Sequence, residues 1–193
     1  MEKLAVQTLG TQQERTFETS RDIALVVGAS VVVALCARYL SFSLMPYTPV
    51  PLTMQNFAVL LVGLLLGSRR GFAALALYLV EGIAGLPVFS PGVGGAAQLF
   101  GATGGFLLAY PFVAFLAGYV FERGAKSFLR AAAAGLLAEI LLFTGGLSWL
   151  YVFTHSLAKA AYLGLYWFLA AEVMKIMIAA AIATRWQRFA AKR

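Results

Sequence analysis

Long apolar segments, separated by short polar ones, make up most of this chain. Six of them can be placed, at approximately residues 22–39, 51–66, 71–86, 103–121, 131–153 and 160–184. Each is close to the length that a tilted helix needs to cross the hydrocarbon core of a bilayer, about 17–25 residues. In lipid a segment must satisfy its backbone N–H and C=O groups internally, so we expect all six to be helices. The pattern predicts an all-α, polytopic integral membrane protein with six transmembrane helices.

The second segment is the shortest, and the stretch YTPVPL leads into it. Proline suits the first turn of a helix because it has no backbone N–H, while the residue before a proline favours an extended backbone. We therefore expect an extended approach through Pro49 and a helix whose first turn contains Pro51.

Basic residues are concentrated on one side of the predicted bundle. Twelve of the 15 Lys and Arg residues lie before the first segment, after the sixth, or in the connections at 67–70 and 122–130. By the positive-inside rule these parts are cytoplasmic, and an even number of helices also requires both termini on one side. We expect residues 1–21 and 185–193 to be cytoplasmic tails around a single membrane domain at 22–184. The first tail has no apolar core followed by a small-residue cleavage site, so we do not interpret it as a signal peptide.

The composition agrees with this class and argues against others. Hydrophobic residues make up 61% of the 193 residues and charged residues 12%, which is far from the balance of a soluble domain. The net charge of +7 belongs to segments that flank apolar spans, so we expect no nucleic-acid partner. The single cysteine, Cys36, allows no intrachain disulfide. The single histidine, His155, lies near a predicted helix end and is interpreted as an interfacial residue and not as a metal ligand.

Motifs for catalysis and nucleotide binding are missing from the sequence. It contains no GxxxxGK[ST], GxSxG, HExxH or spaced Cys/His cluster. Residues 92–97 match GxGxxA, but they follow a proline-rich loop between two membrane segments, so we expect no dinucleotide site there. We predict that the chain is not an enzyme and has no catalytic residues, no metal and no cofactor. If transport is powered, the power comes from another chain.

Four charged residues fall inside apolar segments: Glu81, Glu139, Glu172 and Lys175. Such a charge costs roughly 2.5–3.5 kcal/mol at mid-bilayer and usually marks a functional site. Glu172 and Lys175 are three residues apart and so share one helix face. They are either a self-compensating pair or the polar wall of an outward cavity, and we favour the cavity because a buried ion pair adds little stability. Glu139 is interpreted as either an interhelical hydrogen bond or a ligand contact.

Small residues recur at a spacing of four in the first segment, as Ala24-x-x-x-Gly28 and Ser30-x-x-x-Ala34. This spacing lets two helix backbones approach closely in lipid. The pattern leaves two alternatives open, internal packing and docking of a partner helix.

Two long stretches of the chain resemble one known family. They are TPVPLTMQNFAVLLVGLLLG at 48–67 and GLPVFSPGVGGAAQLFGATGGFLLAYP at 85–111, and the E-x-x-K of Glu172 and Lys175 adds to them. On these motifs the chain is identified as a member of the BioY family, the biotin-specific substrate-binding (S) components of energy-coupling factor (ECF) transporters. The resemblance extends from the first segment to the sixth.

The resemblance implies a high-affinity biotin-binding protein of the prokaryotic cell membrane, with six helices, both termini inside and a site that opens outward. The implied partners are biotin, a transmembrane coupling protein and two ATP-binding cassette ATPases. The small residues that would meet the coupling protein are Ala24, Gly28, Ser30 and Ala34. The alternatives are an S component for another vitamin, an intramembrane enzyme with a buried glutamate as base, and a purely structural subunit.

The resemblance also implies which residues hold biotin. Glu172 would accept a ureido N–H, and Lys175 would bind the carboxylate or orient Glu172. The other expected members are the pocket-closing residues Gln55, Gly94, Gly95 and Gly104, the hydrogen-bonding residues Gln98 and Thr103, and the apolar walls Tyr110 and Trp149. The chain departs from the family pattern at Glu172, where an aspartate is usual, and at Val93, where some relatives carry a polar ligand contact.

Overall fold

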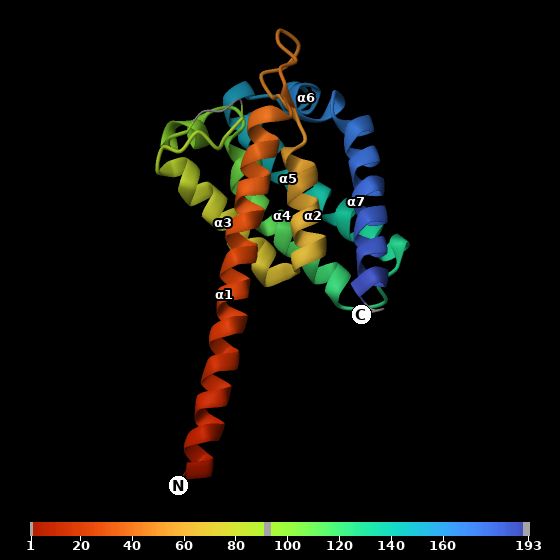
Figure 1. The fold of residues 1–193 in the computed structure, drawn as a ribbon. Coiled ribbons are helices and arrows are strands. Elements are labelled where there is room, and N and C mark those ends of the chain that lie inside the picture. The colour runs from red at the N-terminus through yellow and green to blue at the C-terminus, as the bar shows by residue number, and fades with distance from the viewer. Residues whose placement is uncertain (1, 91–93, 191–193) are drawn as a thin grey trace.

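The computed structural model describes residues 2–90 and 94–190, with side chains from residue 19 onward. Within these residues the chain is mainly helical, and its helices pack into a bundle from which the first helix projects (Figure 1). The α-helices are α1 (Glu2–Tyr39), α2 (Gln55–Leu66), α3 (Ser68–Ile83), α4 (Gly104–Glu122), α5 (Phe128–Thr154), α6 (Leu157–Ala161) and α7 (Leu169–Ala190). A 3₁₀ turn, η1 (Ala96–Phe100), precedes α4, and a π-helical turn, η2 (Tyr162–Tyr166), follows α6.

The connection between α1 and α2 forms a small antiparallel hairpin in which β1 (Ser41–Phe42) pairs with β2 (Leu52–Thr53). The hairpin lies at the same end of the bundle as α6, opposite the C-terminus (Figure 1). The prediction that Pro51 lies in the first turn of α2 is therefore wrong, because the helix begins at Gln55. Leu52 and Thr53 pair with β1 instead of entering the helix, and the Met54 N–H donates to the carbonyl of Leu40 at 2.9 Å.

The last predicted segment is a broken helix. The axis of α6 and η2 differs from that of α7 by 47°. The π-helical turn interrupts the α-helical hydrogen-bond ladder, and such turns are often found where a helix is bent at a functional site. The predicted continuous helix at 160–184 is thus wrong in its first turns, and its second part continues to Ala190. The first helix also starts earlier than its apolar part, at Glu2.

Three of the described helices are long and apolar enough to cross a membrane: the Thr19–Tyr39 part of α1, α4 and α5. The bent pair of α6–η2 and α7 gives a fourth if it counts as one span, while α2, with 12 residues, is shorter. The structure therefore supports three or four of the six predicted spans by length and composition.

Apolar side chains also cover the outside of these helices. Val31 of α1, Ile140 of α5 and Val173 of α7 are each about half exposed, at 47%, 55% and 53%. Exposed apolar surface on this scale is unusual for a soluble monomer and is typical of a surface in contact with lipid.

Helix α4 packs against α2, α3 and α5 and forms the centre of the bundle. Glycines allow these close approaches. A Cβ atom on Gly63 of α2 would collide with the backbone carbonyl of Ala114 in α4, and one on Gly118 would collide with the backbone N of Ser68 in α3. Small residues at helix contacts are the usual means of packing in lipid.

Polar contacts close the end of the bundle opposite the hairpin. Arg70 pairs with Asp22 at 2.7 Å and joins α3 to α1. The Glu122 carboxylate accepts hydrogen bonds from the backbone N and the hydroxyl of Ser68, at 3.0 and 2.7 Å. Glu122 therefore satisfies a free N–H at the start of α3.

Candidate functional site

A cavity lies beneath the hairpin, between α2, α4, α5, η2 and α7. Its volume is about 60 Å³. Its lining is mostly apolar, with a few polar side chains at one end. The lining residues are Val50, Pro51, Thr53, Gln55, Asn56, Ser90, Thr103, Phe106, Leu107, Tyr110, Leu142, Phe143, Gly164, Phe168 and Glu172.

Two of the polar lining residues, Asn56 and Glu172, belong to a network of four buried side chains from three helices. Asn56 of α2 donates from Nδ2 to Glu139 Oε1 of α5 and to Glu172 Oε2 of α7, at 2.7 Å each. Lys175 Nζ forms an ion pair with Glu172 Oε1 at 2.8 Å. All four residues are between 3% and 6% exposed. The shared helix face predicted from the spacing is confirmed by this ion pair, which is the first of the two alternatives; of the two residues only Glu172 lines the cavity. Glu139 makes an interhelical hydrogen bond.

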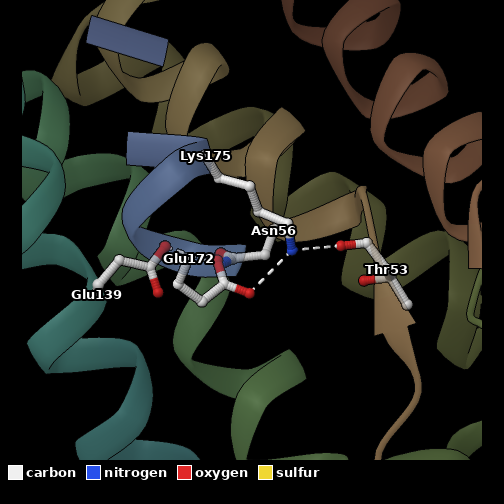
Figure 2. Close-up of polar contacts among 5 residues, drawn as sticks. All are labelled: Thr53, Asn56, Glu139, Glu172 and Lys175. Atoms are coloured by element: carbon white, nitrogen blue, oxygen red, sulfur yellow. Dashed lines mark hydrogen bonds and ion pairs between the residues drawn. The ribbon is translucent and has the colours of Figure 1, made fainter. Parts of the chain in front are cut away.

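Lys175 also binds the hairpin. Its Nζ donates to the backbone carbonyl of Thr53 at 2.6 Å, so that the ammonium lies between that carbonyl and the Glu172 carboxylate (Figure 2). One side chain therefore links α7 to β2. A buried ammonium needs such partners because it is expensive to remove from water.

Two further contacts fix the segment that covers the cavity. Thr48 Oγ1 donates to the carbonyl of Leu163 in η2 at 2.6 Å and accepts from the Val50 N–H at 3.0 Å. The hydroxyls of Ser41 and Ser90 are hydrogen bonded to each other. The hairpin segment is therefore held from α7, from η2 and from the loop after α3.

The predicted residue Gln55 lies in the cavity wall but is engaged elsewhere. Its Nε2 donates to the hydroxyl of Tyr78 at 2.8 Å, and that hydroxyl donates to the carbonyl of Val88 at 2.9 Å. Gln55 thus ties α2 to the loop after α3. The predicted wall residue Tyr110 does line the cavity and is 5% exposed.

The remaining predicted polar residues hold the loop before α4. Thr103 lines the cavity, and Gln98 donates to the Thr103 hydroxyl at 3.4 Å and to the Ser90 carbonyl at 3.5 Å. Trp149 lies outside the lining, and its indole N–H donates to the carbonyl of Gly101 at 2.8 Å. These three side chains therefore shape the loop, and only Thr103 reaches the cavity in this arrangement.

The predicted glycines are needed by the backbone. Gly95 has a φ of 100°, which side chains rarely tolerate. A Cβ on Gly94 would collide with the carbonyl of Leu86, and one on Gly104 with the carbonyl of Leu99. Val93 and Gly92 lie outside the described residues.

Two residues of the site were missed by sequence reasoning, Asn56 and Thr53. Thr53 acts through its backbone carbonyl, for which side-chain identity gives no signal. Asn56 could have been found, since it is a side-chain amide that opens an otherwise apolar helix, next to the predicted Gln55. Its partners come from helices more than 80 positions away along the chain.

The predicted docking residues fall into two groups. Ala24 and Gly28 are exposed, and a Cβ atom on Gly28 would meet nothing within 4 Å. Ser30 is fully buried and donates to Glu81 of α3 at 2.6 Å, and Ala34 is partly buried. Of the two alternatives, the described contacts show internal packing at Ser30 and leave the Ala24–Gly28 face open.

Among residues 2–90 and 94–190, no group of three or more His, Cys, Asp or Glu side chains is placed to hold a metal ion.

Comparison with known proteins gives the family. The sequence model of the BioY family matches residues 8–192. The chain belongs to the BioY family. The BioY proteins most similar in sequence include one from Pyrococcus horikoshii named probable biotin transporter BioY, which is 37% identical over 139 residues, or 72% of this chain and 82% of that protein. Another, from Thermotoga maritima and named biotin transporter BioY, is 35% identical over 148 residues, or 77% of this chain and 87% of that protein.

A BioY-like fold is also found among solved structures. The crystal structure of the S-component for biotin from an ECF-type ABC transporter superposes with a TM-score of 0.80, over 89% of this chain and 93% of that one. The sequence identity is 21%, so this likeness concerns the fold. The predicted family is therefore confirmed, and the fold agrees with it.

Proposed function

We propose that this BioY-family chain is the biotin-binding S component of an ECF-type uptake transporter. The observation that carries the proposal is the position of Glu172, which lines a mostly apolar cavity under the hairpin and is ion-paired with Lys175. Ligand sites commonly combine an apolar wall with a few well-placed polar groups. The names of the relatives, biotin transporters, point to the same ligand.

Biotin has chemistry that suits this wall. Its thiophane ring and valeryl chain are apolar, and Phe106, Leu107 and Phe143 offer apolar surface. Its ureido group carries two N–H donors, and Glu172, with about four acceptor positions on its two oxygens, can accept one while keeping its present partners. Lys175, which is not among the lining residues, holds Glu172 in place through their ion pair.

Biotin would enter the cavity from the hairpin end of the bundle. The hairpin segment and the loop before α4 are the parts that cover it. Their movement would open the site toward the hairpin end of the bundle, which we assign to the outside of the cell.

The orientation in the membrane follows from the basic residues. Arg70, Arg123 and Arg130 lie at the end opposite the hairpin, which the positive-inside rule assigns to the cytoplasm. In this proposal six membrane segments bring both termini to that side. The exposed Ala24–Gly28 face of α1 docks on a transmembrane coupling protein, and two ATP-binding cassette ATPases supply the energy.

The direct test is binding of radiolabelled biotin to the purified protein in detergent or nanodiscs. We expect saturable binding below micromolar concentration, competed by unlabelled biotin and not by other vitamins. A Glu122→Gln variant is the matched control, since it changes a carboxylate at the opposite end of the bundle. Absence of saturable binding at micromolar biotin would contradict the proposal. Competition by a different vitamin would indicate that this vitamin is the ligand instead of biotin.

A further inference from the structure

The orientation of the Asn56 amide is fixed by its two neighbours. An amide NH₂ group has two hydrogens, and Asn56 Nδ2 gives one to Glu139 and one to Glu172, both at 2.7 Å. The reverse orientation would place the amide oxygen against the Glu172 carboxylate, which is ion-paired with Lys175, with no hydrogen between the two oxygens. The hydrogen-bond network therefore determines which end of the amide is nitrogen.

This arrangement leaves the carbonyl oxygen of Asn56 as a free acceptor. Oδ1 is buried and has no hydrogen-bond partner, although Asn56 is part of the cavity lining. Buried polar atoms nearly always have partners, because an unmet acceptor loses its water without compensation. An unpartnered acceptor in a cavity wall is therefore a position that a donor on a ligand can fill.

None of the neighbouring donors is hydrogen bonded to this oxygen. Both hydrogens of the Asn56 amide are used, and Gln55 donates to Tyr78. Lys175 already donates to Glu172 and to Thr53. The polar end of the cavity thus has more acceptors than donors, and it favours a ligand that brings N–H groups.

We infer that Asn56 is a ligand-binding residue that determines specificity, with Oδ1 accepting one N–H of a cyclic urea while Glu172 accepts the other. Glu139 acts as a positioning residue, because it holds the Asn56 amide in the orientation that leaves Oδ1 without a partner inside the protein. This inference rests on the proposed function. It adds that one ureido N–H is bound by a residue of α2 and the other by a residue of α7.

The test compares biotin with two analogues that carry a methyl group on one or the other ureido nitrogen. In the native protein we expect each methylation to weaken binding by roughly tenfold or more, since it removes a donor from a buried acceptor. In Asn56→Leu one analogue should bind only about twofold more weakly than biotin, while the loss of affinity for the other analogue persists. Glu172→Gln should reduce the penalty for the second analogue instead.

Two further variants separate ligand contact from folding. Asn56→Thr replaces the amide by a hydroxyl that can donate to one carboxylate. If the leucine variant does not fold, this variant is used to measure the same loss of affinity on methylation. Glu139→Gln keeps an acceptor for the Asn56 amide, so both methylated analogues should still bind more weakly than biotin. Glu139→Leu removes this acceptor and should reduce the loss of affinity for the analogue that Asn56 discriminates against. Circular dichroism and size-exclusion profiles identify the folded variants.

The inference is supported if the folded Asn56 variants lose discrimination against one analogue only. It is overturned if the native protein binds biotin but tolerates both methylations, or if both penalties survive in the folded Asn56 variants. A native protein that binds no biotin contradicts the proposed function itself, which is a different result.

Discussion

Lys175 Nζ lies 2.6 Å from the backbone carbonyl oxygen of Thr53, and this contact ties helix α7 to the hairpin over the cavity. The same ammonium neutralises Glu172 at 2.8 Å. Lys175 therefore joins the cavity residue Glu172 to the hairpin that covers the cavity. Its replacement should affect both ligand binding and the position of the hairpin.

Lys175→Met should weaken biotin binding by tenfold or more and lower stability by about 3–5 kcal/mol, because it leaves Glu172 buried without a counter-charge. Hydrogen exchange in the hairpin segment should become faster, since its link to α7 is lost. Mass-spectrometric exchange and thermal unfolding in detergent measure the two effects. Lys159→Met is the control, because Lys159 is an exposed lysine of α6. Unchanged exchange in the hairpin would rule out the link.

Glu172→Asp should weaken biotin binding by roughly threefold to tenfold, the value of about one hydrogen bond. The present carboxylate reaches both Asn56 and Lys175, and a side chain shorter by one methylene cannot keep both contacts without a backbone shift. Isothermal titration with biotin measures the change. Tighter binding by the aspartate would show that the longer side chain is not adapted to this site.

Thr48→Val should speed the dissociation of biotin. The substitution keeps the shape of the side chain but removes the hydroxyl that binds the Leu163 carbonyl and the Val50 N–H, at a cost of about 1–3 kcal/mol for the groups left unpaired. A chase of bound radiolabelled biotin gives the rate. Thr144→Val on the exposed side of α5 is the matched control, and equal rates in the two variants would contradict a role for Thr48 in holding the cover.

Gly63→Ala should destabilise the fold by about 1–3 kcal/mol, because the new Cβ would overlap the Ala114 carbonyl. Gly28→Ala makes the same chemical change at a helix position with open space around it, and it should leave stability and biotin binding unchanged. Thermal unfolding of the two variants makes the comparison. A similar loss in both would mean that the helix contact at Gly63 is not the cause.

Gly28→Leu should weaken copurification with the coupling protein while biotin binding by the isolated chain stays normal. The larger side chain would stand out from the exposed Ala24–Gly28 face and prevent close approach of a partner helix. Leu25→Ala, which removes bulk beside that face, serves as a control for general surface change. Normal copurification of the leucine variant would place the docking surface elsewhere.

The parts of the fold that depend on local pattern were predictable. The apolar lengths of α4 and α5 fit a membrane span, and a spacing of three residues brought Glu172 and Lys175 together. Contacts between distant segments were not predictable, since nothing near Lys175 indicates that its second partner is a carbonyl 122 positions earlier.

The errors have related causes. Leu52 and Thr53 form a strand because they pair with Ser41 and Phe42. The proline-rich sequence before α2 gives no sign of this pairing. The break before α7 arises in a π-helical turn whose sequence is as apolar as its surroundings. The Asn56 amide stands out in the apolar sequence of α2, but the rotation of the helix that turns it toward Glu139 and Glu172 is set by packing and was not predictable.

The described residues that line the cavity all lie between Val50 and Glu172, whereas α1 ends at Tyr39. The helix with the open small-residue face is thus a different part of the molecule from the wall that selects the ligand. Substitutions in the cavity that change the ligand need not alter the exposed Ala24–Gly28 face of α1. Likewise, substitutions in that face need not alter the cavity. In the proposed arrangement, the residues of α1 that would contact a coupling protein can therefore stay the same while the residues of the cavity change.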